Sequence, residues 1–136
     1  MLRETPTEFT LSLNSDERGL LAFANLPFAV KRFYSISSNL KNLPRGNHAH
    51  KVLRQAIFCA QGSFRLMLNT PEKDFAYTLT AWSSLVIVPA GYWRVLDEFT
   101  KDSICIVLAS DEFSESDYIR DYLEYEKWFW ESTNES

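Results

Sequence analysis

Hydrophobic and polar residues alternate over short segments along most of the chain. The alternation predicts strands over 8–13, 20–24 and 30–36, with a turn over 14–16 between the first two. Further strands are predicted at a spacing of about ten residues, separated by turns rich in Gly, Pro and Asn: 56–60, 63–68, 75–80, 84–88, 95–99 and 103–109. Such a series is typical of an all-β protein, folded as an antiparallel barrel or a double-sheet roll.

The segment 30–36 carries polar side chains on one face. Side chains two residues apart on a strand point the same way, so Arg32 and Tyr34 share a face with apolar neighbours. An arginine and a tyrosine in that setting indicate the inner wall of a barrel that holds a polar ligand.

Beyond Ser110 the pattern becomes helical. Ser114 and Asp117 have the spacing of a capping box, and aromatic residues then recur at helical intervals, at Tyr118, Tyr122, Tyr125 and Phe129. We therefore expect a C-terminal helix over 114–130, whose aromatic face packs on the barrel or on a second subunit.

Composition narrows the class of protein. With 136 residues, 46% of them hydrophobic, the chain can bury a core, and we expect one domain over 1–136. The net charge of −4 disfavours a nucleic-acid partner, which requires a basic surface. No apolar run is long enough to span a membrane and the amino terminus lacks the apolar core of a signal peptide, so a cytoplasmic protein is expected. Cys59 and Cys105 lie in apolar runs and are expected to be buried thiols.

The two histidines of the chain, His48 and His50, are the strongest chemical signal. Their spacing places both imidazoles on one face of a strand, which suggests either a metal site or an acid/base site. The stretch RGNHAHKVLRQAIFCAQG, with Gln55 five residues after His50, resembles the first motif of the cupin barrels, and PAGYWR resembles the second.

In that resemblance, Gln55 and Arg94 occupy positions at which many cupins place metal ligands. A catalytic metal usually takes at least three His, Cys or carboxylate ligands, and a guanidinium cannot ligate a metal. We therefore expect an acid/base cupin with no metal and no cofactor.

Over nearly its whole length the sequence resembles the cupin sugar 3,4-ketoisomerases (WxcM-like), which act on dTDP-4-keto-6-deoxyglucose. The blocks that carry the resemblance are DERGLLAFANLPFAVKRFY, RGNHAHK, VPAGYWRVLDEF and IVLASDEFSESDYIRDYLEY. The resemblance implies an RmlC-like cupin barrel, a dTDP-sugar substrate in a deoxysugar pathway that leads to O-antigen or another surface polysaccharide, and a homodimer with an amino-terminal strand exchanged or shared.

The resemblance also implies roles for individual residues. His48 is the expected base, Tyr34 the proton relay or donor, and His50 orients the sugar or tunes the pair. Arg94 stabilises charge on a sugar oxygen; arginine rather than histidine at this position leans toward the gluco product. Candidates for binding the rest of the substrate are Arg32, Arg45 and Lys51 at the pyrophosphate and Gln55 at the sugar or the base.

Three alternatives stay open. A sugar-nucleotide-binding cupin without catalysis would not need Tyr34 and the paired histidines. A C3/C5 sugar-nucleotide epimerase would use the same proton removal next to a ketone. A metal-dependent oxygenase is the least favoured of the three.

Overall fold

The structure is a computed structural model that describes residues 3–37 and 40–134, and these ranges are folded mainly into antiparallel strands. The first strands along the chain are β1 (Thr7–Thr10), β2 (Ser12–Asp16), β3 (Gly19–Phe23), β4 (Arg32–Ser37), β5 (Arg45–His50) and β6 (Gln55–Gln61). They are followed by β7 (Ser63–Asn69), β8 (Asp74–Thr80), β9 (Ser84–Val88), β10 (Trp93–Asp97), β11 (Ile104–Ala109) and the short β12 (Tyr118–Ile119). One α-helix, α1 (Tyr122–Asn134), ends the described chain.

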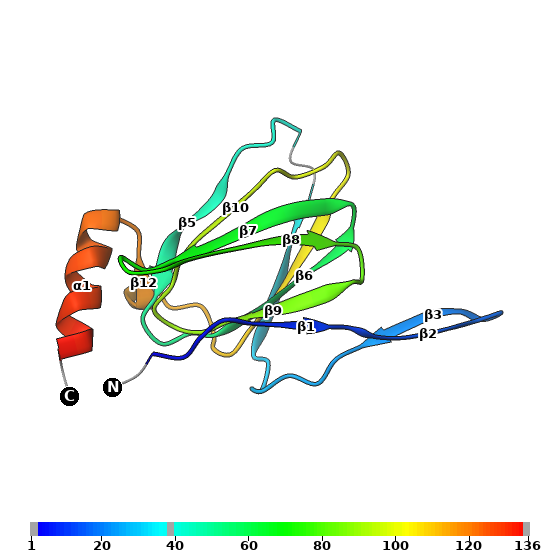
Figure 1. The fold of residues 1–136 in the computed structure, drawn as a ribbon, viewed down its shortest axis with the longest axis horizontal. Helices are drawn as coiled ribbons and strands as arrows, with labels where there is room; N and C mark the ends of the chain where they lie inside the picture. Colours follow the sequence, from blue (N-terminus) through cyan, green and yellow to red (C-terminus); the bar gives the residue numbers. More distant parts are fainter. Residues whose placement is uncertain (1–2, 38–39, 135–136) are drawn as a thin grey trace.

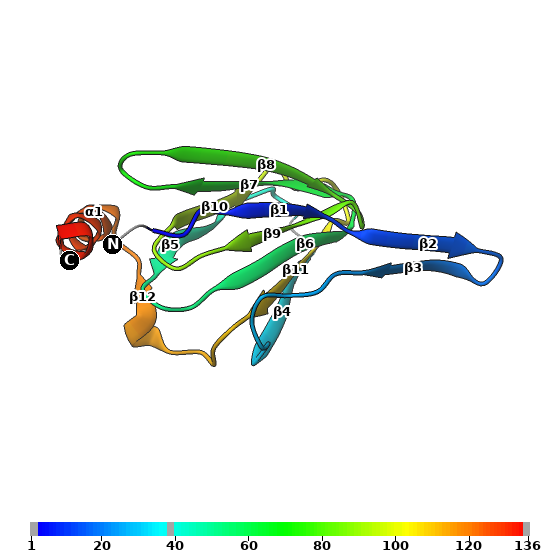
Figure 2. The same ribbon diagram turned by 60° about the horizontal axis from the view of Figure 1, so that its bottom comes forward.

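Two five-stranded sheets face each other, as Figures 1 and 2 show. One has the strand order β1-β9-β6-β11-β4 and the other the order β12-β5-β10-β7-β8. The main hydrophobic core lies between them and receives side chains from both. On β7, for example, Phe64, Leu66 and Leu68 are buried while the residues between them are not, because the strand alternates between core and solvent. The predicted antiparallel double-sheet architecture is confirmed.

The amino-terminal hairpin differs from its prediction. The expected strand over 8–13 is divided at Leu11, whose side chain turns into a separate apolar cluster beside β9. The expected turn at 14–16 is wrong: β2 continues to Asp16, whose Oδ1 accepts a hydrogen bond (2.8 Å) from the backbone N–H of Arg18 and so fixes the turn two residues later. Within the described ranges, strands β2 and β3 pair only with each other, and they project from the barrel as an arm (Figures 1 and 2).

The C-terminal segment also departs from its prediction, because the helix expected over 114–130 begins only at Tyr122. The side chain of Ser114 makes no capping hydrogen bond; Glu115–Asp117 form a single 3₁₀ turn, and β12 then pairs with β5. Asp121 caps α1 instead, since its Oδ1 accepts the N–H of Glu124 at 3.0 Å. The segment pairs with β5 instead of forming a helix, and this pairing places Asp117 at the end of the barrel.

Helix α1 covers one end of the barrel, opposite the arm (Figure 1). Its buried Tyr125 and Phe129 pack against Trp93, Ala49 and Ile119, so these two members of the predicted aromatic face do pack on the barrel. No helix in the described part of the chain combines the length and the apolar character that a membrane crossing needs.

Candidate active site

Strand β5 directs both histidines into the end of the barrel. His48 lies opposite Arg94 in the β5–β10 register, and Gly46 allows the two strands to approach there. A Cβ on Gly46 would lie 2.8 Å from the backbone oxygen of Arg94, and its φ of 93° is one that other residues rarely adopt. The glycine of the RGNHAH block is therefore required to bring the imidazole of His48 beside Arg94.

His48 is fixed as a neutral base. Its Nδ1 lies 3.0 Å from the carbonyl oxygen of Gly46, which can only accept, so Nδ1 carries the proton. Its Nε2 is buried and has no hydrogen-bond partner within the described ranges. Burial, together with the nearby cation of Arg94, lowers the pKa of His48 to about 4. At neutral pH the lone pair of Nε2 is thus free to take a proton.

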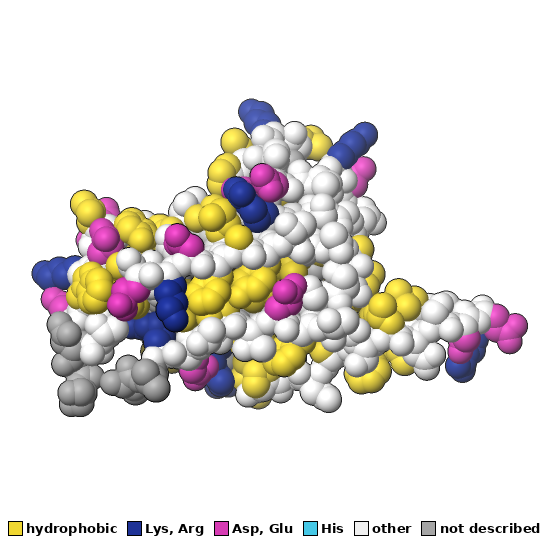
Figure 3. Space-filling view, in the orientation of Figure 1, with side chains coloured by type: hydrophobic (Ala, Val, Ile, Leu, Met, Phe, Trp, Pro, Cys, Tyr) yellow, Lys and Arg dark blue, Asp and Glu magenta, His cyan; other side chains and the backbone are white. Residues whose placement is uncertain are grey.

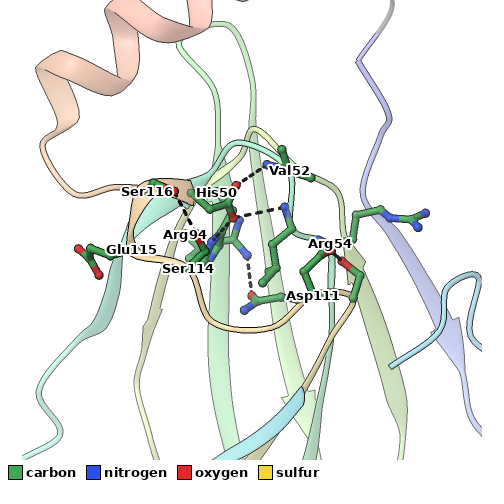
Figure 4. Close-up of polar contacts among 12 residues, drawn as sticks. His50, Val52, Arg54, Arg94, Asp111, Ser114, Glu115 and Ser116 are labelled. Atoms are coloured by element: carbon green, nitrogen blue, oxygen red, sulfur yellow. Dashed lines mark hydrogen bonds and ion pairs between the residues drawn. The ribbon is translucent and has the colours of Figure 1, made fainter. Parts of the chain in front are cut away.

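His50 is fully buried and is held by a different kind of partner. Its Nδ1 lies 3.0 Å from Oδ2 of Asp117, and its Nε2 is also buried without a partner among the described residues. Burial, and then the cation of Arg94, lowers the pKa of His50. Figure 4 shows His50 and Arg94 close together, beside the loop that carries Ser114 and Ser116.

Asp117 is a site residue that sequence reasoning missed. Its spacing from Ser114 is that of a capping box, which predicts a helix start and conceals its contact with His50. The only sequence signal is that it belongs to the ESDYIR block that resembles the ketoisomerases.

A buried hydrogen-bonded chain connects three more of the predicted residues. Nη1 of Arg94 donates to Oε1 of Gln55 (2.6 Å), and Nε2 of Gln55 donates to the hydroxyl oxygen of Tyr34 (3.2 Å). Arginine can only donate, so it sets the orientation of the amide. Because the oxygen of Tyr34 accepts from Gln55, its own proton is available to another acceptor. Burial raises the pKa of Tyr34, which therefore stays protonated at neutral pH.

Arg94 is a buried cation without a counter-ion. Its side chain is 1% exposed, and none of the ion pairs in the described part of the chain includes it. A second donor, Nη2, bonds the carbonyl oxygen of Tyr92 (3.0 Å), while Nε is unpaired. Burial lowers the pKa of Arg94 to about 10, so it remains charged at pH 7. An isolated buried charge is costly, and this one is suited to receive negative charge that develops on a ligand.

Tyr118 and Arg32 lie around this group. The ring of Tyr118 is 4.9 Å from the ring of His48 and 4.3 Å from that of His50, between centroids. The guanidinium of Arg32 lies over Tyr34 (5.4 Å) and over Phe113 (5.5 Å), so it lies at the rim of the site. The helical spacing of the aromatic residues predicts a helix at Tyr118, and Tyr118 is therefore a site residue that the sequence pattern does not reveal.

Two predicted phosphate ligands do not join this group. Arg45 is exposed at the start of β5, where its backbone pairs with Leu96. Lys51 is exposed and lines a separate surface cleft of about 570 Å³ with Arg3 and Arg54.

The described residues contain no group of three or more His, Cys, Asp or Glu side chains that could hold a metal ion. Cys59 and Cys105 are free and buried, as expected.

Comparison with known proteins adds independent information. A family model described as FdtA, WxcM-like, C-terminal, matches residues 6–130. A TDP-4-oxo-6-deoxy-alpha-D-glucose-3,4-oxoisomerase from Aneurinibacillus thermoaerophilus is 37% identical over 117 residues, which cover 83% of this chain and 84% of that protein.

Solved structures show the same relationship. A variant of the 3,4-ketoisomerase QdtA from Thermoanaerobacterium thermosaccharolyticum, in complex with TDP-4-keto-6-deoxyglucose, has a TM-score of 0.88 and 29% identity, covering 96% of this chain and 97% of that chain. The rmlC epimerase of Mycobacterium tuberculosis, at 16% identity and a TM-score of 0.74, covers 85% of this chain and 70% of that chain, and shares the fold. The predicted RmlC-like barrel is thus confirmed, and the chain belongs to the FdtA family of WxcM-like proteins.

Proposed function

We propose that this chain is a sugar-nucleotide 3,4-ketoisomerase, which moves the keto group of a dTDP-linked 4-keto-6-deoxyhexose from C4 to C3. The observation that carries the proposal is the grouping in one barrel end of two neutral imidazoles with free Nε2 atoms, a protonated phenol and an unpaired buried cation. The family, and a 37% identical oxoisomerase that covers most of the chain, point to the same reaction.

In the first half of the reaction, Nε2 of His48 takes the proton from C3. The electron pair of the C3–H bond forms the C3–C4 double bond, and the C4 carbonyl oxygen becomes negatively charged. Arg94 stabilises this oxyanion, and the imidazolium of His48 then transfers its proton to it, which gives a neutral enediol.

In the second half, the double-bond electrons take the proton of Tyr34 at C4, the electron pair of the O3–H bond forms the C3 carbonyl, and the proton released from O3 restores the phenol. Gln55 supports this role because it donates to the oxygen of Tyr34 and leaves the phenolic proton free. Arg32, at the rim beside Tyr34, is the best-placed candidate for the pyrophosphate. Arg45 and Lys51 stay weaker candidates for it.

We further propose that no metal takes part. The donor set supports this, since Gln55 and Arg94 stand at cupin ligand positions and leave His48 and His50 as two imidazole ligands, fewer than the three that a catalytic metal usually takes. A cytoplasmic role in making a deoxysugar for a surface polysaccharide stays a prediction, which a 3-aminotransferase gene beside this one would support.

A product assay tests the function directly. The protein, treated with EDTA and incubated with dTDP-4-keto-6-deoxyglucose, is expected to yield the 3-keto sugar, identified by ¹³C and ¹H NMR. In heavy water the proton at C3 is expected to exchange. A product that keeps its ketone at C4 but is inverted at C3 or C5 would instead identify an epimerase, and no exchange at all would identify a binding module.

We also propose a homodimer formed through the β2–β3 arm. Four large apolar side chains of the arm are each more than half exposed: Leu13, Leu20, Leu21 and Phe23. They occupy both faces of the hairpin, because residues paired across the strands share a face. Figure 3 shows hydrophobic side chains on the arm and charged ones at its tip. Exposed apolar side chains on a projecting hairpin are typical of an interface with a second copy.

A single charged substitution tests whether the arm forms the dimer interface. Leu21→Glu is expected to raise the dimer dissociation constant by about 100-fold, because an unpaired charge in an interface costs about 3 kcal/mol. Sedimentation velocity over a range of concentrations measures it. Leu123→Glu is the matched control, since Leu123 is 76% exposed on α1, away from the arm. An unchanged dimer in Leu21→Glu would exclude the arm as the interface.

A further inference from the structure

The contact between Asp117 and His50 is an acid–imidazole pair inside the barrel. Oδ2 of Asp117 lies 3.0 Å from Nδ1 of His50, the imidazole is fully buried, and the carboxylate is 14% exposed. The two residues are far apart in the chain but meet because Tyr118 of β12 pairs with His50 of β5.

Both carboxylate oxygens of Asp117 accept hydrogen bonds from backbone N–H groups. Its Oδ1 accepts the N–H of Val52 at 2.8 Å, and Oδ2 accepts the N–H of Leu53 at 3.4 Å. Its own carbonyl oxygen accepts the N–H of Lys51 at 3.0 Å. In Figure 4, Ser116 of the neighbouring loop lies on one side of His50 and Val52 on the other. Asp117 is therefore locked in place, and it imposes one orientation on His50.

The two imidazoles are consequently not equivalent. Both have their proton on Nδ1 and a free Nε2, but His48 donates to a neutral carbonyl and His50 to a carboxylate. A carboxylate on the far nitrogen fixes the tautomer and stabilises the imidazolium once Nε2 accepts a proton. His50 is thus the more firmly oriented of the two imidazoles, and Nε2 is its only nitrogen left for a ligand.

We propose that Asp117 is a positioning residue that presents Nε2 of His50 to the C3 hydroxyl of the substrate. In the second half of the reaction, the O3–H bond breaks, its proton moves to Nε2 of His50, and the electron pair forms the C3 carbonyl. The double-bond electrons take the proton of Tyr34 at C4, and the imidazolium of His50 returns a proton to the phenolate. This inference rests on the proposed function and divides its two proton abstractions, from C3 and from the C3 hydroxyl, between the two histidines.

The test separates the two halves of the reaction. Asp117→Asn is expected to lower kcat for ketone transfer by about 10²-fold, the low end for general acid–base catalysis, with KM unchanged. Exchange of the C3 proton in heavy water, which needs only His48, is expected to stay within about threefold of wild type. Glu112→Gln is the matched control, because it removes an exposed carboxylate from the same loop and is expected to change neither rate.

His50→Gln provides the second arm, since it leaves the bonds of Asp117 to Val52 and Leu53 in place. Like Asp117→Asn, it is expected to lower kcat for ketone transfer and to leave C3 exchange near the wild-type rate. In the double variant, Asp117→Asn is expected to lower kcat by less than about a further twofold. Equal loss of exchange and transfer in His50→Gln, or a full effect of Asp117→Asn in the His50→Gln background, would overturn the proposal. A wild-type protein that forms no 3-keto product would instead overturn the proposed function itself.

Discussion

Replacing His48 with asparagine is expected to lower kcat for ketone transfer by about 10³-fold and to abolish C3 exchange, because Nε2 of His50 is assigned to the C3 hydroxyl in the proposed reaction and does not replace the base at C3. The effect on folding should be small, since the hydrogen bond of the imidazole is to the neighbouring carbonyl of Gly46. NMR of the product, exchange in heavy water and thermal unfolding measure the three quantities. Near-normal exchange in a folded variant would show that His48 is not the base.

The pH dependence follows from the same residue. His48 acts as a base only when neutral, and its pKa of about 4 means that kcat/KM is full at neutral pH and falls as the pH drops through about 4. The negative diphosphate of a bound substrate favours the imidazolium, so the acid limb of kcat is expected at higher pH than that of kcat/KM. A pH profile of both parameters between about 3 and 8 provides the measurement. An acid limb of kcat/KM near the ordinary histidine pKa, about 6.5, would contradict the burial of this imidazole.

Much of the site could be predicted from sequence because its signals are local. Alternation placed Tyr34 on an inner face, and the two-residue spacing put His48 and His50 together. The cupin-like motifs added Gln55 and Arg94, which lie far apart in sequence but occupy fixed places in a known barrel. In the structure, hydrogen bonds join Arg94, Gln55 and Tyr34 in one chain.

The rest depended on contacts that local patterns do not contain. The two-residue strand β12 forms only because β5 offers it an edge, and a Ser-x-x-Asp spacing fits a helix start just as well. The spacing therefore predicted the wrong start for the helix and concealed Asp117 and Tyr118. Arg45 and Lys51 flank the histidine motif in sequence, but proximity along a strand does not decide whether a side chain points inward.

Replacing Arg94 with methionine is the second large effect expected. The variant retains a long side chain but loses the cation, so kcat should fall by about 10²–10³-fold, the cost of removing an oxyanion donor. Because the Arg94 cation helps to lower the pKa of His48, the acid limb of kcat/KM should also move to higher pH. Steady-state kinetics across pH measure both. Wild-type kcat in this variant would mean that the buried charge does not act on the substrate.

The thermal stability of the Arg94→Met variant shows whether the Arg94 cation serves catalysis or folding. Arg94 is buried and forms no ion pair in the described part of the chain. Methionine therefore removes a desolvation cost of several kcal/mol, against the loss of donors to Gln55 and Tyr92. The Tm of Arg94→Met should therefore be no lower than that of the wild type. Arg65→Met is the matched control on the next strand: Arg65 donates to both carboxylate oxygens of Asp97 (2.8 and 2.7 Å), and its loss should lower the Tm while activity is unchanged. A Tm that falls further in Arg94→Met than in Arg65→Met would show that Arg94 is retained for folding. We expect the Tm to fall further in Arg65→Met than in Arg94→Met. The buried charge of Arg94 destabilises the free protein, and it gains a partner only when a substrate oxygen becomes negative.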